Sequence, residues 1–198
     1  MPQSPSLTDS GQLWTRAATG SDEALVDLSR AYPDLRLERD AGGALIVMNP
    51  TKPFTGTRNS QLSAALTVWA NADNTGLPFD SSTGWKLPNG AVRSPDASWV
   101  RKERWSALTA EELDSFSPLC PDFAVELLSS PGDLDKDQGK MGEYMACGAR
   151  LGWLIDPFKR EVHVYRPQQE VEVLTDPDTI TGEQVLPGFT LKMSLIWS

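Results

Sequence analysis

One short run of apolar residues with embedded acids constrains the fold of this chain more than any other feature. The run Pro121–Leu128 reads Pro-Asp-Phe-Ala-Val-Glu-Leu-Leu. As a β-strand, it sends Phe123, Val125 and Leu127 to one face of a sheet. Glu126 then faces the other way, inside a strand of the buried type. An isolated buried charge is too costly, so the sequence predicts that Glu126 is paired, hydrogen-bonded or bound to a metal.

A second strand-like run and a helix bring further polar residues into the argument. The run Ser94–Val100 also opens on Pro-Asp, which places Asp96 at the start of a predicted strand. The segment 133–149 is typical of a helix, and on it Lys140 and Tyr144 are four residues apart and share a face. Two acids on neighbouring strands and a lysine on the next helix therefore form the candidate site.

These residue types suit the hydrolysis of a phosphodiester bond. Mg²⁺ prefers oxygen ligands and often takes only one or two carboxylates, with water and substrate completing its shell. Asp96 and Glu126 supply such a pair. A nearby lysine, here Lys140, neutralises developing charge or helps to position the attacking water.

Each of these residues also has an ordinary structural interpretation, which the spacing alone leaves open. Asp96 after a proline can end a turn and accept backbone hydrogen bonds. Glu126 can belong to a structural salt bridge, and Lys140 can be a solvated helix residue. Tyr144 is interpreted as a core residue with its hydroxyl at the surface.

Charge and histidine content exclude several function classes. The net charge of −9 argues against a general nucleic-acid binder that relies on a basic patch. The single histidine, His163, rules out a histidine-rich zinc centre, and a Ser-His-Asp hydrolase would have to use it. His163 lies in a strictly alternating run, 161–166, which predicts a half-exposed strand with the imidazole at the surface.

Three further features of the sequence lead us to expect a cytoplasmic protein. The sequence lacks an apolar run of the roughly 18 residues that a membrane span needs. The start, Met1–Ser10, lacks a basic region followed by an apolar one, so we expect no secretory signal. Cys120 and Cys147 are far apart and fit no CxxC pattern, so we expect two reduced thiols.

The order of predicted elements indicates a mixed α+β or α/β fold in one domain. A helix capped by Ser21 precedes a hairpin over 35–48, and a second helix over 57–74 ends near Gly76. A block of strands, the helix over 133–149 and further strands follow. We therefore predict a flexible arm over residues 1–20 and one domain over 21–198.

Several of these motifs, taken in order, resemble the Uma-type restriction endonuclease family. They are Ser94–Val100, Pro121–Ser129, the run Lys140-Met141-x-Glu143-Tyr144, Gly152–Pro157 and Leu186–Phe189. The similarity covers nearly the whole chain from about Ser21 onward. That family belongs to the PD-(D/E)XK nuclease superfamily. The resemblance thus implies a restriction-endonuclease-like mixed sheet flanked by helices, and an endonuclease that cleaves DNA with Mg²⁺ or Mn²⁺.

The resemblance also implies a set of metal ligands. Asp96 matches the first acid of the superfamily pattern and Glu126 the second. The backbone carbonyl of Leu127 matches the intervening position that often contributes a metal ligand. Glu38 resembles a family acid near the first hairpin, and the resemblance makes it a candidate for an additional metal ligand.

One departure from the superfamily pattern concerns the catalytic lysine. The pattern has lysine two residues after the second acid, where this chain has Leu128. The family resemblance suggests instead a lysine that has migrated to the helix, which matches Lys140. We therefore expect Asp96, Glu126 and Lys140 to be the catalytic residues.

Two rival functions use the same features. The missing strand lysine and the acidic charge favour a catalytically degenerate nuclease fold that binds nucleic acid or protein. The seven tryptophans would alternatively fill an interface in a structural homo-oligomer. We expect DNA as the substrate and no membrane partner. The oligomeric state that we expect is a homodimer.

Overall fold

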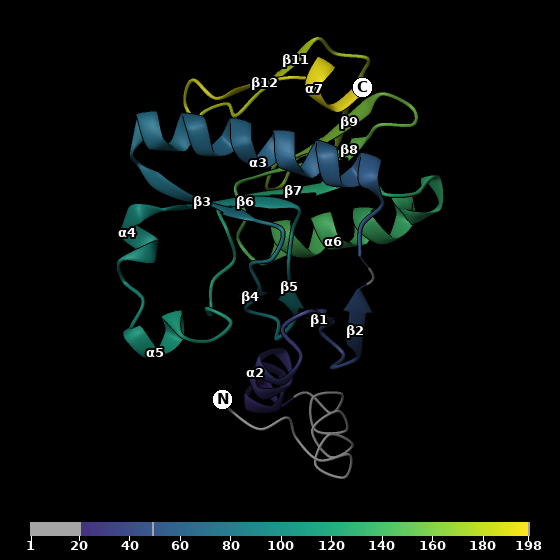
Figure 1. Ribbon diagram of the computed structural model, residues 1–198. Coiled ribbons are helices and arrows are strands. Elements are labelled where there is room, and N and C mark those ends of the chain that lie inside the picture. Colours follow the sequence, from purple (N-terminus) through teal and green to yellow (C-terminus); the bar gives the residue numbers. More distant parts are fainter. Residues whose placement is uncertain (1–20, 49, 198) are drawn as a thin grey trace. The chain divides into compact units, whose positions relative to one another are not determined.

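The computed structural model describes residues 21–48 and 50–197, and these form two compact units (Figure 1). The small unit takes the chain up to Pro50, then Gly84–Ser94 and Thr109–Leu119. The large unit takes Thr51–Thr83, Pro95–Leu108 and the chain from Cys120 onward. The arm predicted for residues 1–20 lies outside the described residues, and the single domain over 21–198 stays a prediction.

In its described residues, the small unit has a four-stranded antiparallel sheet and the helices α2 and α5. The strand order is β2-β1-β5-β4. Ser21 caps helix α2 as predicted, because its hydroxyl accepts a hydrogen bond from the Ala24 N–H at 3.3 Å. The predicted hairpin is confirmed, with Arg36 opposite Met48. The elements are α2 (Asp22–Ala31), β1 (Arg36–Arg39), β2 (Leu45–Met48), β4 (Trp85–Lys86), β5 (Val92–Arg93) and α5 (Ala110–Leu113).

The large unit is built on a six-stranded mixed sheet in the order β10-β9-β8-β7-β6-β3. Among the described strands of this sheet, only β7 and β8 pair in parallel, and α6 forms the crossover that a parallel pair requires. A separate two-stranded ribbon pairs β11 with β12. The elements up to α6 are α3 (Pro53–Asp73), β3 (Gly76–Asp80), β6 (Ala97–Arg101), α4 (Lys102–Trp105), β7 (Phe123–Leu127), a 3-10 turn (Pro131–Asp133) and α6 (Leu134–Ala146). The elements after it are β8 (Leu151–Asp156), β9 (Glu161–Tyr165), β10 (Glu172–Thr175), β11 (Thr179–Thr181), β12 (Thr190–Lys192) and α7 (Ser194–Trp197).

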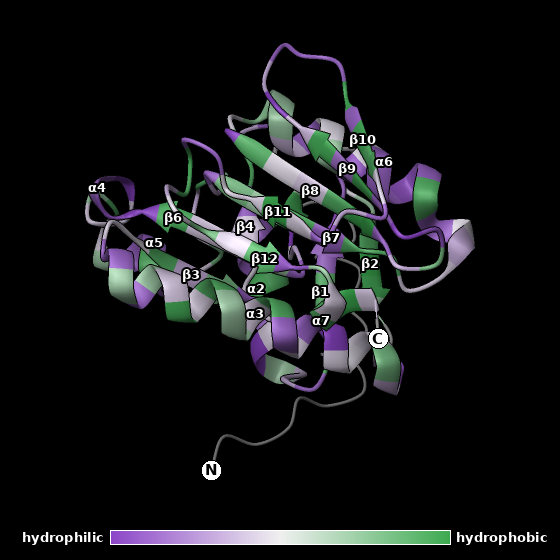
Figure 2. Cartoon of the chain, turned by 90° about the horizontal axis from the view of Figure 1, so that it is seen from above, coloured by the Kyte–Doolittle hydropathy of each residue, from purple (hydrophilic) through white to green (hydrophobic). Residues whose placement is uncertain are grey.

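The long helices α3 and α6 cover opposite faces of this sheet (Figure 1). Phe123, Val125 and Leu127 point to the α3 side, where they join one hydrophobic core with Leu62 and Leu66. Hydrophobic residues recur along β6, β8 and β9 in Figure 2. The predicted alternation of β7 is therefore confirmed, and so is the mixed sheet flanked by helices.

Helix α6 packs closely on the other face because β8 carries a glycine there. A β-carbon at Gly152 would lie only 2.3 Å from Met141 Cε. The missing side chain lets α6 approach the sheet, which brings the polar residues on the inner face of α6 within reach of β7.

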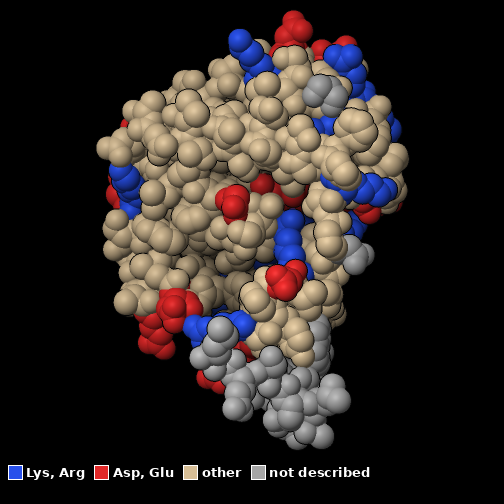
Figure 3. Space-filling model, viewed as in Figure 1, with Lys and Arg blue, Asp and Glu red and all other residues tan. Residues whose placement is uncertain are grey.

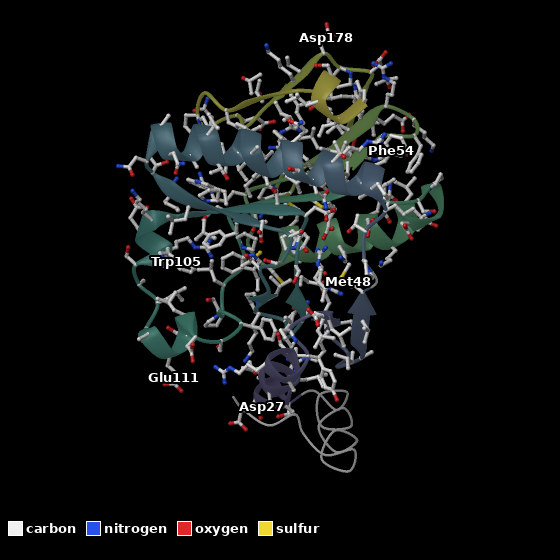
Figure 4. The ribbon with its side chains drawn as sticks, viewed as in Figure 1. Asp27, Met48, Phe54, Trp105, Glu111 and Asp178 are labelled. Atoms are coloured by element: carbon white, nitrogen blue, oxygen red, sulfur yellow. The ribbon has the colours of Figure 1, made fainter. Side chains whose placement is uncertain are left out.

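Helix α3 begins earlier than the sequence predicts. It starts at Pro53, with Lys52 as an N-cap that makes no side-chain hydrogen bond, so the usual capping signal is missing. Phe54, at this end of α3 in Figure 4, is 74% exposed. The expected stop at Gly76 was also wrong: Asn74 ends the helix in the left-handed conformation, and Gly76 opens β3.

The structure also bears on the expectations about thiols and membrane spans. Cys120 and Cys147 are both free, as predicted. Within residues 21–48 and 50–197, no helix combines the length and apolar character needed to cross a membrane. Trp85, Trp99 and Trp153 are buried in the units themselves.

Candidate functional site

Asp96 lies at the start of β6 with its carboxylate held from two directions. Its Oδ2 accepts a hydrogen bond from the backbone N–H of Leu127 at 2.9 Å. Its Oδ1 accepts one from the side-chain amide of Asn59, on α3, also at 2.9 Å. The residue is buried. Asp96 thus joins three elements of the large unit, because it connects the end of β7 and helix α3 to the start of β6.

Glu126 is buried on the α6 side of β7 and accepts two hydrogen bonds at one oxygen. The Tyr144 hydroxyl donates to Glu126 Oε1 at 2.9 Å, and Lys140 Nζ lies 3.3 Å from the same atom. Lys140 and Tyr144 are buried as well, one helical turn apart on α6. The helix face expected from the i, i+4 spacing is therefore confirmed.

The sheet register brings the two acids to adjacent positions. Strands β6 and β7 pair antiparallel with Ala97 opposite Val125. Asp96 and Glu126, the next residues in line, consequently meet at the same end of this strand pair. The structure brings together Asp96, Glu126 and Lys140, and Leu127 adjoins them through its N–H bond to Asp96.

Glu38 lies in the small unit, at β1, and is almost fully buried. Its Oε1 accepts a hydrogen bond from the Ser94 N–H at 3.1 Å, and its Oε2 lies 3.4 Å from Arg93 Nη1. These contacts hold Glu38 within that unit. Its assignment as a metal ligand stays a prediction.

Three residues at or near the site differ from the sequence-based interpretation. The hydroxyl of Tyr144 was expected at the surface, but it is buried and bound to Glu126. Asn59 was not singled out at all. The available signal was a polar residue three positions before Leu62, a core residue of α3. A single asparagine at such a position does not by itself indicate a functional role. His163 was expected at the surface and is buried, because β9 is flanked by β8 and β10 and is also packed against α6.

Asp137 is a further buried acid, and the sequence-based interpretation did not single it out. It precedes Lys140 by three residues and shares the buried face of α6. Burial raises the pKa of its carboxyl to about 6, against the opposing attraction of the Lys140 and Lys136 ammonium groups. The charge of Asp96 contributes to that rise. Asp137 therefore responds to the same charges that define the site.

The donor set suits a hard divalent cation held by few protein ligands. No three His, Cys, Asp or Glu side chains of the described residues gather as a metal cluster. Two carboxylates are present, and the buried Oδ1 of Asn59 has no hydrogen-bond partner among the described residues. Oxygen donors of this number fit Mg²⁺ or Mn²⁺, which keep water ligands, and do not fit a closed zinc site.

The viewed surface carries both signs of charge. Around the C-terminal elements at the top of Figure 3, Lys and Arg side chains are interspersed with Asp and Glu. The net charge of −9 also differs from the basic footprint of a general nucleic-acid binder.

Comparison with solved structures shows the fold independently. A crystal structure described as a putative nuclease belonging to DUF820, from Anabaena variabilis ATCC 29413, superposes with a TM-score of 0.67. The two chains are 24% identical, and the match covers 81% of this chain and 89% of the other. Among curated proteins, no sequence matched this chain.

The family comparison covers nearly all of the described chain. The family model described as "Uma2: Putative restriction endonuclease" matches residues 22–194. This range includes both acids, Lys140 and Tyr144, and every strand of the six-stranded sheet. The chain belongs to the Uma2 family of restriction-endonuclease-like proteins.

Proposed function

We propose that this protein is a metal-dependent endonuclease that hydrolyses phosphodiester bonds in DNA. The observation that carries the proposal is the meeting of Asp96 and Glu126 at one end of β6 and β7, with Lys140 bound to Glu126. Membership of the Uma2 family supports a nucleic-acid substrate. A cytoplasmic location is part of the proposal, supported by two free thiols.

Asp96, Glu126 and the backbone carbonyl of Leu127 are the residues that would hold Mg²⁺ or Mn²⁺. The cation supplies charge to bind the scissile phosphate and to increase the acidity of water. The protein's own contribution is preorganisation. The Leu127 N–H and the Asn59 amide fix the Asp96 carboxylate, and Tyr144 fixes that of Glu126.

Lys140 has the charge and the location for the third role. Its ammonium is buried beside Glu126, in surroundings where its charge is weakly screened. Near a phosphodiester, this ammonium stabilises negative charge that develops on the phosphoryl oxygens and orients the attacking water. The side chain comes from α6 and not from the strand position occupied by Leu128, as the resemblance suggests for a migrated lysine.

A catalytically degenerate nuclease fold that binds nucleic acid or protein is the second candidate function. The observation that favours it is the pairing of Lys140 with Glu126, which compensates both buried charges within the chain itself. In that case Asp96, Glu126 and Lys140 fix how the strands and α6 are arranged, and turnover is absent.

The deciding experiment is cleavage of supercoiled and linear DNA with Mg²⁺, Mn²⁺ or chelator. We expect metal-dependent nicking by the wild type, and a loss of about 100-fold or more in Asp96→Asn, Glu126→Gln and Lys140→Ala. Lys136→Ala, an exposed lysine on the same helix, is the matched control and should keep the wild-type rate.

The folding of each variant needs a separate check, because removing one partner of a buried pair leaves an uncompensated charge. The double variant Glu126→Gln with Lys140→Gln removes both charges and should fold better than either single variant. Full nicking activity in folded Glu126→Gln would overturn the endonuclease site. A wild type that neither cleaves DNA nor shows a metal-induced thermal shift would favour the binding module.

A further inference from the structure

The side-chain amide of Asn59 has one satisfied end and one unsatisfied end. Its Nδ2 donates to Asp96 Oδ1 at 2.9 Å, and this bond assigns which end is nitrogen and which is oxygen. Its Oδ1 is buried and accepts no hydrogen bond from the described residues. A buried carbonyl oxygen without a donor has lost its hydrogen bonds to water and gained none in return, which is unfavourable.

This oxygen differs in kind from the other buried side-chain atoms that make no hydrogen bond. Within residues 21–48 and 50–197, those other atoms are nitrogens of arginine, tryptophan and histidine side chains. Asn59 Oδ1 is the only oxygen among them. An oxygen has the lone pairs that a hard cation takes as ligands, whereas a protonated nitrogen does not.

The position of Asn59 also connects it to the acids. It lies on α3, which covers one face of the sheet, while Lys140 and Tyr144 reach Glu126 from α6 on the other face (Figure 1). Asp96 and Glu126 meet at one end of the β6–β7 pair, where Asp96 contacts α3 and Glu126 contacts α6. The amide therefore reaches Asp96 from the helix on the face of the sheet that α6 does not cover.

The hydrogen bond to Asp96 accounts for the amide nitrogen of Asn59 but not for the burial of its carbonyl oxygen. A residue with a donor alone would orient that carboxylate equally well. It would not leave an electron-rich carbonyl close to a negative carboxylate, an arrangement that is unfavourable unless a positive charge or a donor compensates it.

We propose that Asn59 Oδ1 is an oxygen donor of the divalent-cation site formed with Asp96 and Glu126. The inference rests on the proposed function and specifies its cation site more closely. Together, the three side chains form a hard, all-oxygen donor set from β6, β7 and α3, which suits Mg²⁺ or Mn²⁺.

Binding of Mn²⁺ to the full chain, measured by electron paramagnetic resonance and calorimetry without DNA, tests this role. Asn59→Ala should weaken Mn²⁺ binding by about 10-fold or more. Asn59→Asp keeps an oxygen at the position of Oδ1 but loses the amide donor, so it should bind Mn²⁺ at least as tightly as the wild type. Asn71→Ala, at an exposed position on the same helix, should leave Mn²⁺ binding unchanged.

A thermal readout separates the ligand role from a purely structural one. Without metal, Asn59→Asp places a second carboxylate beside Asp96 and should unfold at a lower temperature than the wild type. Mn²⁺ should then raise its unfolding temperature more than it raises that of the wild type. If Asn59→Ala does not fold, Asn59→Ser serves as the variant without the carbonyl oxygen.

The outcomes that overturn the inference differ from those that overturn the proposed function. If Asn59→Asp binds Mn²⁺ as weakly as Asn59→Ala, the amide acts only as a donor to Asp96. If Mn²⁺ binding is lost in Asp96→Asn but unchanged in Asn59→Ala, the cation site stands without Asn59. A wild type that binds no Mn²⁺ overturns both the cation site and the role of Asn59.

Discussion

At Glu126 the chain buries a carboxylate together with an ammonium and a hydroxyl that hold it. Such a cluster is a weak source of stability, because desolvation of the two charges offsets much of their attraction. The arrangement is better understood as preorganisation, since it fixes a carboxylate in one orientation at the end of a rigid strand. The same reasoning applies to Asp96, whose two hydrogen bonds come from different elements.

Asp137 gives a prediction at the residue scale. Burial raises the pKa of its carboxyl from 3.8 to about 6, so the folded chain binds this proton more tightly than the unfolded chain does. The stability contributed by the proton is fully present below about pH 4. It is lost as the pH rises to about 6, because ionising the buried carboxyl then costs the folded state free energy.

The measurement is urea unfolding of wild type and Asp137→Asn between pH 4 and pH 7. The pKa rise corresponds to at most about 3 kcal/mol, at about 1.4 kcal/mol per pH unit, and residual contact with water reduces this to about 1–2 kcal/mol. The wild type should lose this amount relative to Asp137→Asn over the interval. A difference between the two proteins that does not change with pH would contradict the assignment.

At the scale of elements, α6 is the helix that carries Lys140 and Tyr144, and two glycines weaken it. Gly139 and Gly142 are exposed in its interior, and a β-carbon at either position meets open space. Glycine in a helix costs about 0.5–1 kcal/mol relative to alanine. Gly142→Ala should therefore raise the free energy of unfolding by about that amount.

The contrasting variant is Gly76→Ala, at the start of β3. A β-carbon there would lie 2.2 Å from the buried Trp99 ring, so the substitution should destabilise the chain by about 1–3 kcal/mol. Chemical unfolding of both variants under identical conditions provides the comparison. Equal shifts of the same sign in the two proteins would show that these glycine environments are misassigned.

At the scale of the whole molecule, the net charge of −9 determines the long-range electrostatic interaction with DNA. An acidic chain is repelled by the phosphate backbone unless cations neutralise part of the charge. We therefore expect the affinity for a DNA duplex to fall at least 10-fold when Mg²⁺ is replaced by chelator. Fluorescence anisotropy measures this binding with Lys140→Ala, the variant that we expect to bind DNA without cleaving it. Lys136→Ala, measured in Ca²⁺, is the comparison. Tight binding in chelator would contradict this expectation.

Much of the large unit was predictable because its signals are local. The alternation in Pro121–Leu128 requires only that one face be apolar, and the sheet confirms it. The i, i+4 spacing of Lys140 and Tyr144 required them to share a helix face, and both contact Glu126. The family resemblance, carried by an ordered set of motifs, predicted the mixed sheet, which the structural match shows.

Other features depend on the tertiary structure and carry no local signal. His163 is buried because β9 is an interior strand, which alternation along one strand does not reveal. The hydroxyl of Tyr144 is buried because α6 lies close against β7 and β8, where Gly152 leaves room for it. Asn59 is separated from Asp96 by 37 residues, and only the packing of α3 on the sheet brings its amide to that carboxylate.

The sequence by itself determined the types of residue available for chemistry and the face of the strand or helix on which each lies. Those properties follow from side-chain identity and from the periods of strands and helices, which act over a few residues. Tertiary structure decided which groups meet, because contacts between distant segments arise from the packing of helices on the sheet. Tertiary structure thus decided which residues contact Glu126, that α3 contacts Asp96, and that Asp137 is buried.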